Sequence, residues 1–484
     1  MLASVTDDRR GVAYEKVDAA YFAERGLKRY ARVWSLWALG VGAVISGDFF
    51  GWNFGLGSGG FGGMLVATAI ITVMYAGLCF SIAEMSPALP HTGGAYSFAR
   101  TALGPWGAFV TGLAENMEFI LTPAVIVVAI GSYLGAIFHT SAELAPLWWL
   151  AAYGVFVGLN VFGVEASFRF TVVITFVALG ILTLFYVTAI PHFDLSLALD
   201  VPGEDAWFPK GWGGVFGALP FAMWFYLAIE ELPLAAEEAH DPAKDMPRGI
   251  LLGLLTLVVA AFLTLVLNTA IPPGAAAIST SEEPLLVGLQ TTLGEDVGAW
   301  LALFAVAGLV ASFHTIVFAY GRQIYSLSRA GYFPRWLSKT HPVRKTPHVA
   351  LVVGATLGFV VALVLHYVGT DHPVGAVLLN MAVFGAVISY VLQMLSFIAL
   401  RVRFPDLPRP YRSPLGIPGA VIALVVALVT LVTLFVVDPV YRLVVIGAAI
   451  WYALGLVYFA VHARKNLVYS PEEDFAEHVA KGGP

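Results

Sequence analysis

The sequence carries little charge: only 12% of its 484 residues are charged, whereas 59% are hydrophobic. Soluble domains contain roughly 25% charged residues, so this composition excludes an ordinary soluble protein. Cysteine is nearly absent, and because Cys79 is the only one, intrachain disulfides and a cysteine-rich metal site are excluded. Residues 1–33 hold no short apolar core of the signal-peptide type, so we expect the first spanning helix to target the chain.

What the sequence has in abundance is long apolar runs, each near the ~20 residues that a helix needs to cross a bilayer. The runs predict an all-α polytopic membrane protein rather than a β-barrel. Twelve spans are expected, at residues 32–56, 62–87, 105–138, 147–163, 168–190, 212–238, 249–271, 297–328, 348–368, 374–400, 417–437 and 442–462.

The basic residues predict the orientation of these spans, because short cytoplasmic loops carry an excess of lysine and arginine. With the N-terminus inside, 24 of the 26 lysines and arginines fall on the inner side, and only Lys210 and Arg442 fall outside. Both termini are therefore expected in the cytoplasm, with the protein in the inner (plasma) membrane. The expected parts are a cytoplasmic segment 1–31, a transmembrane domain 32–462, a cytoplasmic tail 463–484, and long outer loops near 191–211 and 272–296.

Two of the spans contain helix-breaking residues. The first holds "VISGDFFGWNFGLGSGG" at 44–60, and the sixth holds "FAMWFYLAIEELPLAAEE" at 221–238 with a proline inside it. Glycine weakens a helix and proline removes a backbone donor, so both spans should unwind locally. Irregular backbone at membrane depth survives only where protein or a cavity satisfies its polar groups, which predicts that the two breaks face one site.

The position of the breaks predicts how the domain is built. They fall in the first and sixth spans, at corresponding places of two successive five-helix units, a pattern typical of secondary transporters with inverted repeats. The first repeat is expected at about 32–190 and the second at about 212–400, with spans 417–437 and 442–462 outside them.

Acidic residues inside the spans indicate the chemistry of the site. An ionisable group at bilayer depth costs at least ~2.5 kcal/mol and usually marks a pathway or a binding site. No lysine or arginine lies at comparable predicted depth, so the site favours a cation, and a desolvated ammonium over an aromatic face gains ~2 kcal/mol. A small amine fits this chemistry. The acidic residues are Asp48, Glu115, Glu118, Glu230 and Glu231, and the flanking aromatic residues are Phe49, Phe50, Trp52, Trp224, Phe225 and Tyr226.

Each residue also has a simpler interpretation. Asp48 could cap the helix that follows it, Glu115 and Glu118 could bond neighbouring helices, and Glu231 could face water. The aromatic rings could serve packing alone, and His314 could be a hydrogen-bonded core histidine rather than a proton carrier. At the predicted cytoplasmic ends, ion pairs could lock an inner gate or be ordinary surface charges; the residues concerned are Glu84, Glu237 and Glu238 with Arg100, Arg322 and Arg329.

Three stretches together resemble the amino acid–polyamine–organocation transporters along nearly the whole chain. They are "SIAEMSPALPHTGGAYSFAR" at 81–100, "AAEEAHDPAKDMPRGI" at 235–250 and "GRQIYSLSRAGYFP" at 321–334. The resemblance implies the five-plus-five fold of the bacterial leucine transporter, alternating access and no enzymatic activity. Symmetric pore loops, phosphate-binding loops and metal clusters are absent from the sequence, which argues against a channel or a membrane enzyme.

Amino-acid carriers that the chain resembles usually have Gly-Ser-Gly at the first break, where backbone N–H groups hold a substrate carboxylate. The present triplet is Ser46-Gly47-Asp48, and a substrate carboxylate there would meet the like charge of Asp48. The stretches "SGDFFGWNFGL" and "FYLAIEELPLAAEE" resemble the ethanolamine permease branch, and ethanolamine is an ammonium without a carboxylate. The resemblance therefore implies import of a small amine, with amino acids, other amines and polyamines as alternatives.

The sequence is compatible with three ways of coupling transport to an ion. Some proton-coupled members of the resembled family carry a lysine in the fifth span where this chain has Ala178. A carboxylate or His314 could instead carry H⁺, Na⁺ could bind near the first break and Ser312, or the cation could pass without a coupling ion. No cofactor, metal, nucleic acid or obligatory protein partner is expected beyond the lipid bilayer. The expected substrate-binding residues are Ser46, Gly47, Asp48, Phe49, Trp52, Glu118, Trp224, Tyr226 and Glu230. Those expected to serve coupling or gating are Glu115, Glu231, Ser312, His314, Glu84, Glu237 and Arg322.

Overall fold

In a computed structural model of the chain, the described residues are 4–7, 11–201, 207–368, 374–436, 440–469 and 478. The longer helices are α2 Val33–Val44, α3 Phe54–Ala88, α5 Pro105–Phe138, α6 Ala145–Phe162, α7 Val164–Ala189, α9 Gly211–Ala222, α10 Pro242–Thr269, α13 Glu295–Arg329, α14 His348–Val368, α15 Val374–Arg403, α16 Gly416–Val436 and α17 Val440–Val461. The shorter helices are α1 Ala19–Ala23, α4 Gly94–Leu103, α8 Leu195–Ala198, α11 Ala275–Ile278 and α12 Pro284–Leu293. The 3₁₀ segments are Ile45–Asp48, Ala142–Leu144, Ile190–His192, Met223–Phe225, Ile229–Glu238, Arg335–Ser338 and Ala463–Lys465.

The prediction of an all-α polytopic membrane protein is confirmed. Among the described residues, 10 helices are long and apolar enough to cross a membrane. The first expected span is not among them, because its apolar helix Val33–Asp48 is cut short by the break. The count of twelve spans and the inverted repeat therefore stay predictions.

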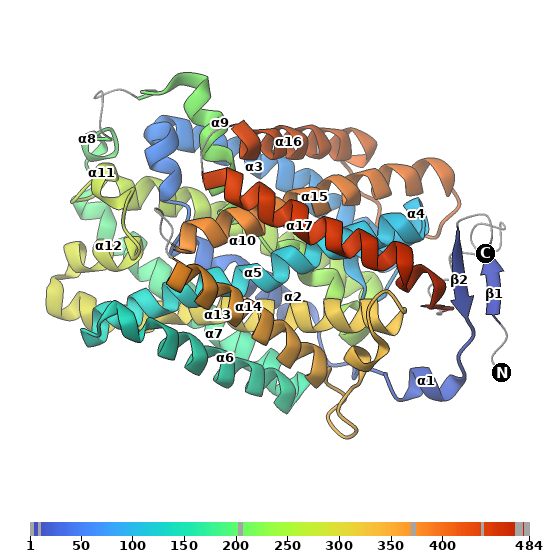
Figure 1. The fold of residues 1–484 in the computed structure, drawn as a ribbon. Helices are drawn as coiled ribbons and strands as arrows, with labels where there is room; N and C mark the ends of the chain where they lie inside the picture. Colours follow the sequence, from blue (N-terminus) through green and yellow to red (C-terminus); the bar gives the residue numbers. More distant parts are fainter. Residues whose placement is uncertain are drawn as a thin grey trace.

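A small sheet that the sequence did not predict joins the two ends of the chain. Strand β2 (Val12–Glu15) pairs antiparallel with β1 (Ser4–Asp7) and parallel with β3 (Leu467–Val468). The sheet lies at one end of the molecule, and α8, α11 and α12 lie at the opposite end (Figure 1). The described parts of the loops predicted to face outward are thus on the far side of the molecule from the sheet.

The first spanning helix is broken where the sequence predicts. Helix α2 ends at Val44, a 3₁₀ turn covers Ile45–Asp48, and the helix resumes at Phe54 as α3. Gly51 makes this break possible, since its φ of 97° lies in the left-handed region that residues with side chains disfavour. Helix α3 then continues into the second span across a kink at Gly60.

The sixth spanning helix is broken as well. Helix α9 ends at Ala222, a short 3₁₀ turn covers Met223–Phe225, and a longer 3₁₀ segment runs over Ile229–Glu238. Ala228 between them has a φ of 84°, a strained conformation for a residue with a side chain and one found where the surroundings dictate the backbone. Pro233 lies inside the 3₁₀ segment, where a regular helix would lose a hydrogen bond.

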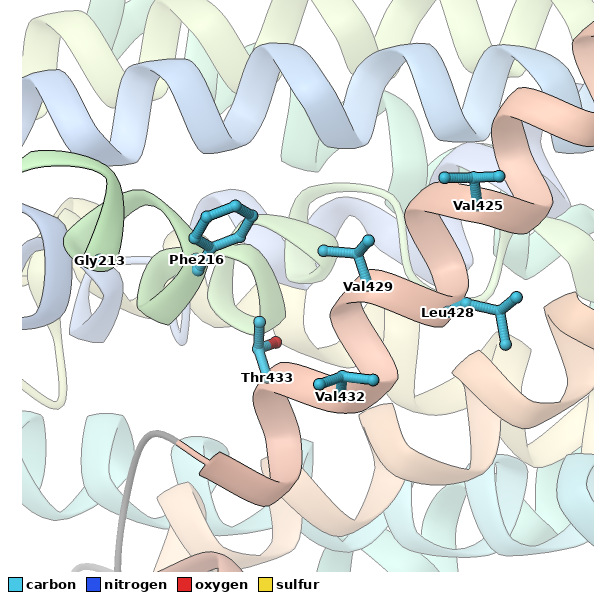
Figure 2. Close-up of a pocket in the computed structure, with 7 residues that line it drawn as sticks. All are labelled: Gly213, Phe216, Val425, Leu428, Val429, Val432 and Thr433. Atoms are coloured by element: carbon cyan, nitrogen blue, oxygen red, sulfur yellow. The ribbon is translucent and has the colours of Figure 1, made fainter.

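Apolar side chains cover the outer faces of the spans. A groove of about 590 Å³ lies between α9 and α16, lined almost wholly by aliphatic and aromatic groups such as Phe216, Val425 and Val429 (Figure 2). Val432, which also lines this groove, is 60% exposed, and Leu454 of α17 is 68% exposed. Such surface is costly in water and favourable in lipid, which agrees with helices that contact the bilayer.

Candidate functional site

The two helix breaks are in direct contact. A Cβ atom on Gly47 would lie 2.1 Å from the Trp224 carbonyl oxygen, and one on Gly51 would lie 2.6 Å from Trp224 Nε1. Only glycine permits so close an approach. The ring of Trp52 stacks on Phe225 across the same contact, with centroids 5.4 Å apart. The two glycines thus bring the backbone of both breaks to one place.

Ser312 of α13 satisfies the backbone at the first break. Its hydroxyl donates to the Gly42 carbonyl at 2.7 Å and accepts from the Ser46 amide at 2.9 Å. The Phe49 carbonyl, left free by the break, accepts from the Tyr133 hydroxyl at 2.8 Å. These bonds explain how an unwound segment persists at membrane depth.

Asp48 lies at the first break and is fully buried. It does not cap the following helix, because the N-cap position belongs to Asn53 and neither Asp48 oxygen makes a hydrogen bond of normal geometry within the described residues. Its side chain lies beside the Thr264 hydroxyl and within electrostatic reach of Tyr186 and Tyr226. The capping interpretation is therefore wrong.

Glu230, at the second break, belongs to a different group of side chains. It lies beside Glu118 of α5 and within electrostatic reach of Tyr75 and Tyr390, whose hydroxyls are 2.9 Å apart. One Glu230 oxygen accepts from the Ala228 amide at 3.2 Å. Two carboxyls in such proximity cannot both be ionised at low cost, so this pair has the geometry to share a proton.

Glu231 is 1% exposed, so the interpretation that it faces water is wrong. Neither of its oxygens, nor either oxygen of Glu118, has a hydrogen-bond partner of normal geometry in the described part of the chain. Within that part, no lysine or arginine forms an ion pair with Asp48, Glu118, Glu230 or Glu231. The region between the breaks is therefore rich in acidic groups and has no protein cation beside them.

The Tyr226 ring lies between the two acidic groups. It packs on Tyr75 with centroids 5.1 Å apart, and its hydroxyl lies 2.6 Å from Thr72 Oγ1. Because Tyr226 is also within reach of Asp48, it connects the Asp48 side of the site with the Glu230 side. Trp224 is 2% exposed, and its Nε1 has no partner among the described residues.

Glu115 links the site to the C-terminal half of α13, because its carboxyl accepts from Gln323 at 2.6 Å. This contact supports the interpretation that Glu115 bonds a neighbouring helix. His314 lies apart from both breaks: its ring nitrogens contact Asn160 at 3.1 Å and Ser167 at 2.9 Å. The structure thus gives His314 the surroundings of a hydrogen-bonded core histidine.

At the end of the molecule that carries the sheet, two ion pairs join the second break to α13. Arg322 contacts Glu238 at 2.8 Å with both side chains fully buried, and Arg329 contacts Glu237 at 2.5 Å. The N-terminal segment closes over them, since the Tyr30 and Ala31 amides both donate to the Glu238 carbonyl. These contacts join the second break, α13 and the N-terminal segment, and their role as an inner gate stays a prediction.

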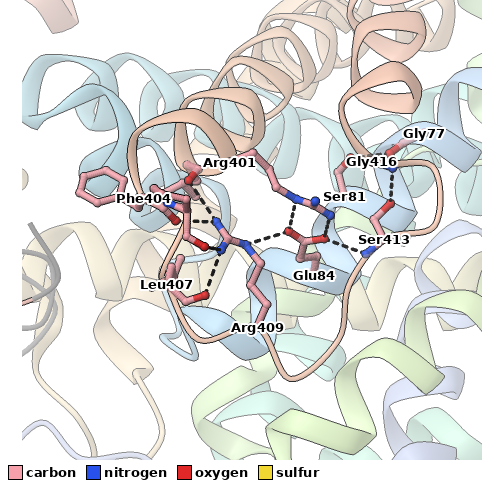
Figure 3. A network of polar contacts seen from close by, with 11 residues as sticks. Gly77, Ser81, Glu84, Arg401, Phe404, Leu407, Arg409, Ser413 and Gly416 are labelled. Atoms are coloured by element: carbon pink, nitrogen blue, oxygen red, sulfur yellow. Dashed lines mark hydrogen bonds and ion pairs between the residues drawn. The ribbon is translucent and has the colours of Figure 1, made fainter. Parts of the chain in front are cut away.

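Glu84 is not part of that cluster, so its expected place beside the gate arginines is wrong. Its carboxylate accepts from Arg401 Nε at 2.6 Å, from Arg409 Nε at 3.0 Å and from the Ser413 amide at 2.7 Å (Figure 3). Arg409 in turn donates to backbone carbonyls that end α15. Glu84 therefore fastens the end of α15 to α3. Arg100 also lies elsewhere, with its guanidinium 5.3 Å from the Tyr332 ring.

Several polar residues beside the site escaped the sequence analysis. Thr264 and Tyr186 stand next to Asp48, while Tyr75 and Tyr390 stand next to Glu230. Single hydroxyls inside apolar spans are common, because they bond the carbonyl one turn before. Only the fold shows that these ones converge on the two breaks.

Comparisons with known proteins agree with this architecture. Residues 32–461 match the family described as "Amino acid permease". The chain is 30% identical over 334 residues to an uncharacterized transporter of Rhizobium meliloti, covering 68% of this chain and 71% of that protein. It is 27% identical over 461 residues to the branched-chain amino acid permease of Bacillus subtilis, covering 93% and 96%. The methylthioribose transporter of the same species is 25% identical over 481 residues, covering 93% and 96%.

The family match spans both breaks, the α13 segment that contacts them and the helices beyond, so it includes every part of the candidate site. These relatives are permeases and transporters, not enzymes. The chain belongs to the amino acid permease family, within the amino acid–polyamine–organocation transporters.

Proposed function

We propose that this transporter imports a small organic ammonium, with ethanolamine as the leading candidate, by alternating access between the two sides of the membrane. The observation that carries the proposal is the set of buried carboxyls at the breaks, which have no lysine or arginine partner within the described residues. A cation that enters this site would be attracted by carboxyl groups that no lysine or arginine of the described residues neutralises. The faces of Trp224 and Tyr226 add cation–π attraction.

An amino acid is the second candidate, and the family match and the B. subtilis branched-chain amino acid permease favour it. Against it stands the chemistry of the first break. The carboxylate of an α-amino acid would approach Asp48, which is fully buried and has no compensating cation beside it. Ethanolamine, with a hydroxyl in place of the carboxylate, avoids this repulsion.

A thermal-unfolding screen of the purified protein separates the two candidates, because a ligand that binds only the folded state stabilises it by about 2.7 kcal/mol at 100 times its Kd. The panel contains ethanolamine, alanine, leucine and a polyamine at matched ionic strength. We expect ethanolamine to raise the melting temperature and both amino acids to leave it unchanged. A rise with leucine or alanine and none with ethanolamine would establish the amino acid instead.

We further propose that a proton accompanies the amine, since Glu118 and Glu230 lie beside each other and can share one. A Na⁺ ion near the first break is the alternative; Ser312, its expected ligand, already bonds Gly42 and Ser46. Uptake into liposomes should respond to a pH gradient at fixed membrane potential. Dependence on Na⁺ with no response to that gradient would remove the proton from the proposal.

The proposed location is the inner membrane with both termini in the cytoplasm. Ser196 in α8 and Val343 in the loop before α14 are exposed at opposite ends of the molecule. In a Cys79→Ala background, Ser196→Cys should react with a membrane-impermeant maleimide in intact cells, and Val343→Cys should react only after lysis. The reverse pattern would invert the orientation.

A further inference from the structure

Three basic side chains from separate parts of the chain line one cavity at the cytoplasmic end of the spans. The cavity has a volume of about 430 Å³, and Lys28 of the N-terminal segment, Arg169 of α7 and Arg344 of the loop before α14 border it. The family match and the proposed transport activity do not account for this cavity. Its wall also contains the turn between α6 and α7.

The positive charge of this cavity is not neutralised by the protein. Glu165 is its one acidic lining residue, and it pairs with Arg169 at 2.6 Å. Within the described residues, neither Lys28 nor Arg344 forms an ion pair; Arg344 instead lies 4.4 Å from the Phe162 ring. The cavity therefore holds a net positive charge that suits an anion.

Backbone geometry adds to the same preference. Helix α7 is 26 residues long, and its N-cap residue Gly163 and first turn line the cavity. The first amides of a helix have no intrahelical acceptor and carry part of the positive end of the helix dipole. Such amides bind phosphate groups well, and here the three cationic side chains surround them.

The position of the cavity beside two spans indicates that the phosphate belongs to a lipid headgroup rather than to a free phosphate ion. Helices α6 and α7 are both apolar enough to span the membrane, and Phe162, at the end of α6, is 63% exposed on the cavity rim. Because each span crosses the hydrocarbon core, the turn that joins two spans lies at the headgroup level, where an exposed apolar ring contacts lipid. Basic pockets between spans on the cytoplasmic side recruit anionic lipids, at about 1 kcal/mol for each lysine or arginine near the surface.

We propose that this cavity, bordered by Lys28, Gly163, Arg169 and Arg344, binds the phosphate headgroup of an anionic phospholipid of the inner leaflet. The headgroup would connect the N-terminal segment to α7. Arg169 Nε already donates to the Tyr30 hydroxyl at 3.2 Å, and the Tyr30 amide donates to Glu238 beside the ion pair with Arg322. A bound lipid would therefore hold the N-terminal segment over the closed gate.

The test titrates short-chain phosphatidylglycerol or phosphatidylcholine into the purified full-length protein in neutral detergent and follows thermal unfolding. The site variant is Lys28→Gln with Arg344→Gln, and Arg344→Gln alone is a second variant. Both residues lie at the surface, and neither belongs to the proposed transport site. The control, Lys339→Gln with Lys465→Gln, removes the same charge from exposed cytoplasmic positions outside the cavity.

We expect saturable stabilisation by phosphatidylglycerol and none by phosphatidylcholine. The double variant should need at least fivefold more lipid for the same effect, the single variant an intermediate amount, and the control no more than the wild-type protein. Equal losses in the double variant and the control would show a diffuse charge effect and overturn the site. Saturation by inorganic phosphate at the concentration that phosphatidylglycerol requires would overturn the lipid assignment.

Discussion

Buried carboxyls occur in two regions of the described structure, and they have charged partners in only one of them. At the end that carries the sheet, Glu84 is 2% exposed and Glu238 is fully buried, yet each contacts an arginine. Between the breaks, Asp48 and Glu231 are as deeply buried but make no hydrogen bond of normal geometry with the described residues.

Physical chemistry gives the two regions opposite roles. A buried carboxylate is tolerated when it is paired and hydrogen-bonded, whereas one without a partner costs several kcal/mol or must take up a proton. The paired groups therefore hold the fold together. The unpaired groups weaken it, which is the pattern expected where a site is built for a ligand or a proton rather than for stability.

The largest effect on stability is expected at Glu84. Glu84→Gln would leave two arginines, Arg401 and Arg409, without their shared carboxylate, and breaking a buried pair in this way costs about 3–5 kcal/mol. Thermal unfolding in detergent should show a large fall in melting temperature. As a control, Asp241→Asn removes only the exposed pair with Lys244, which contributes about 0.5 kcal/mol or less. If the two variants lower the melting temperature equally, the buried pairs of Glu84 do not stabilise the fold more than an exposed pair does.

Substitutions at the breaks should weaken ligand binding without lowering stability. Asp48→Asn and Glu230→Gln remove no ion pair within the described residues, so the melting temperature should stay the same or rise. Binding of ethanolamine should nevertheless fall by more than about 100-fold, because loss of one partner of a buried ionic contact costs about 3–5 kcal/mol. Trp224→Leu should lose less, about 30-fold, because a ring face is worth about 2 kcal/mol.

Calorimetric titration of these three variants measures the order. If Asp48→Asn binds ethanolamine as the wild type does, Asp48 does not take part in recognition. If Trp224→Leu weakens binding more than either charge variant, ring contact rather than charge dominates the site.

A third prediction concerns a carboxyl outside the spans. Burial, and to a lesser degree the charge of Glu282, raises the pKa of Glu283 to about 7. An unfolded glutamate ionises near pH 4.3, so between about pH 4.5 and 7 the folded state keeps a proton that the unfolded state releases. Stability should therefore fall as the pH rises through this window, by at most roughly 3–4 kcal/mol and by less because the side chain is partly exposed, and level off above it.

Glu283→Gln should flatten that part of the pH profile of the melting temperature. Glu143→Gln, at an exposed position in the segment between α5 and α6, is the matched control and should leave the slope as in the wild type. An unchanged slope in Glu283→Gln would mean that this carboxyl ionises in the folded state as it does in the unfolded chain.

The smallest effect is expected at the Arg329–Glu237 pair of the predicted inner gate. These side chains are 10% and 22% exposed, and the neighbouring Arg322–Glu238 pair stays intact when Glu237 is changed. We therefore expect a loss of about 1 kcal/mol, the upper end of the range for exposed pairs. Glu237→Gln should therefore raise the population of the open gate about fivefold. The reporter is the labelling rate of Ala236→Cys in a Cys79→Ala background, measured from the side proposed to be cytoplasmic. Glu15→Gln, which breaks the pair with Arg335 away from the gate, should not change that rate.

Much of this organisation follows from local pattern. The break at Ser46–Asp48 and the interruption after Ala222 are visible in the sequence because glycine, proline and charge are rare in apolar spans. The partners of individual charges are not visible. Glu84 pairs with residues more than 300 positions away, and basic residues are as frequent near the other predicted cytoplasmic ends.

The sequence also does not predict how the side chains are arranged within the site. The sequence predicts that Asp48 and Glu230 lie together around one ammonium, because both are at breaks. In the structure Asp48 is beside Thr264, and Glu230 is beside Glu118, with the Tyr226 ring between the two groups. Which way a side chain leaves an unwound segment depends on tertiary packing, here on the contact of Gly47 with Trp224. No local pattern encodes that direction.

Counterflow in liposomes tests the central claim most directly, because it measures exchange of one chosen substrate without any assumption about coupling. Liposomes containing the purified protein are loaded with unlabelled ethanolamine, alanine or buffer, and uptake of labelled ethanolamine is followed. We predict rapid uptake only into ethanolamine-loaded liposomes, and none with the Asp48→Asn variant. Uptake of labelled alanine driven by internal alanine, with no exchange of ethanolamine, would contradict the account.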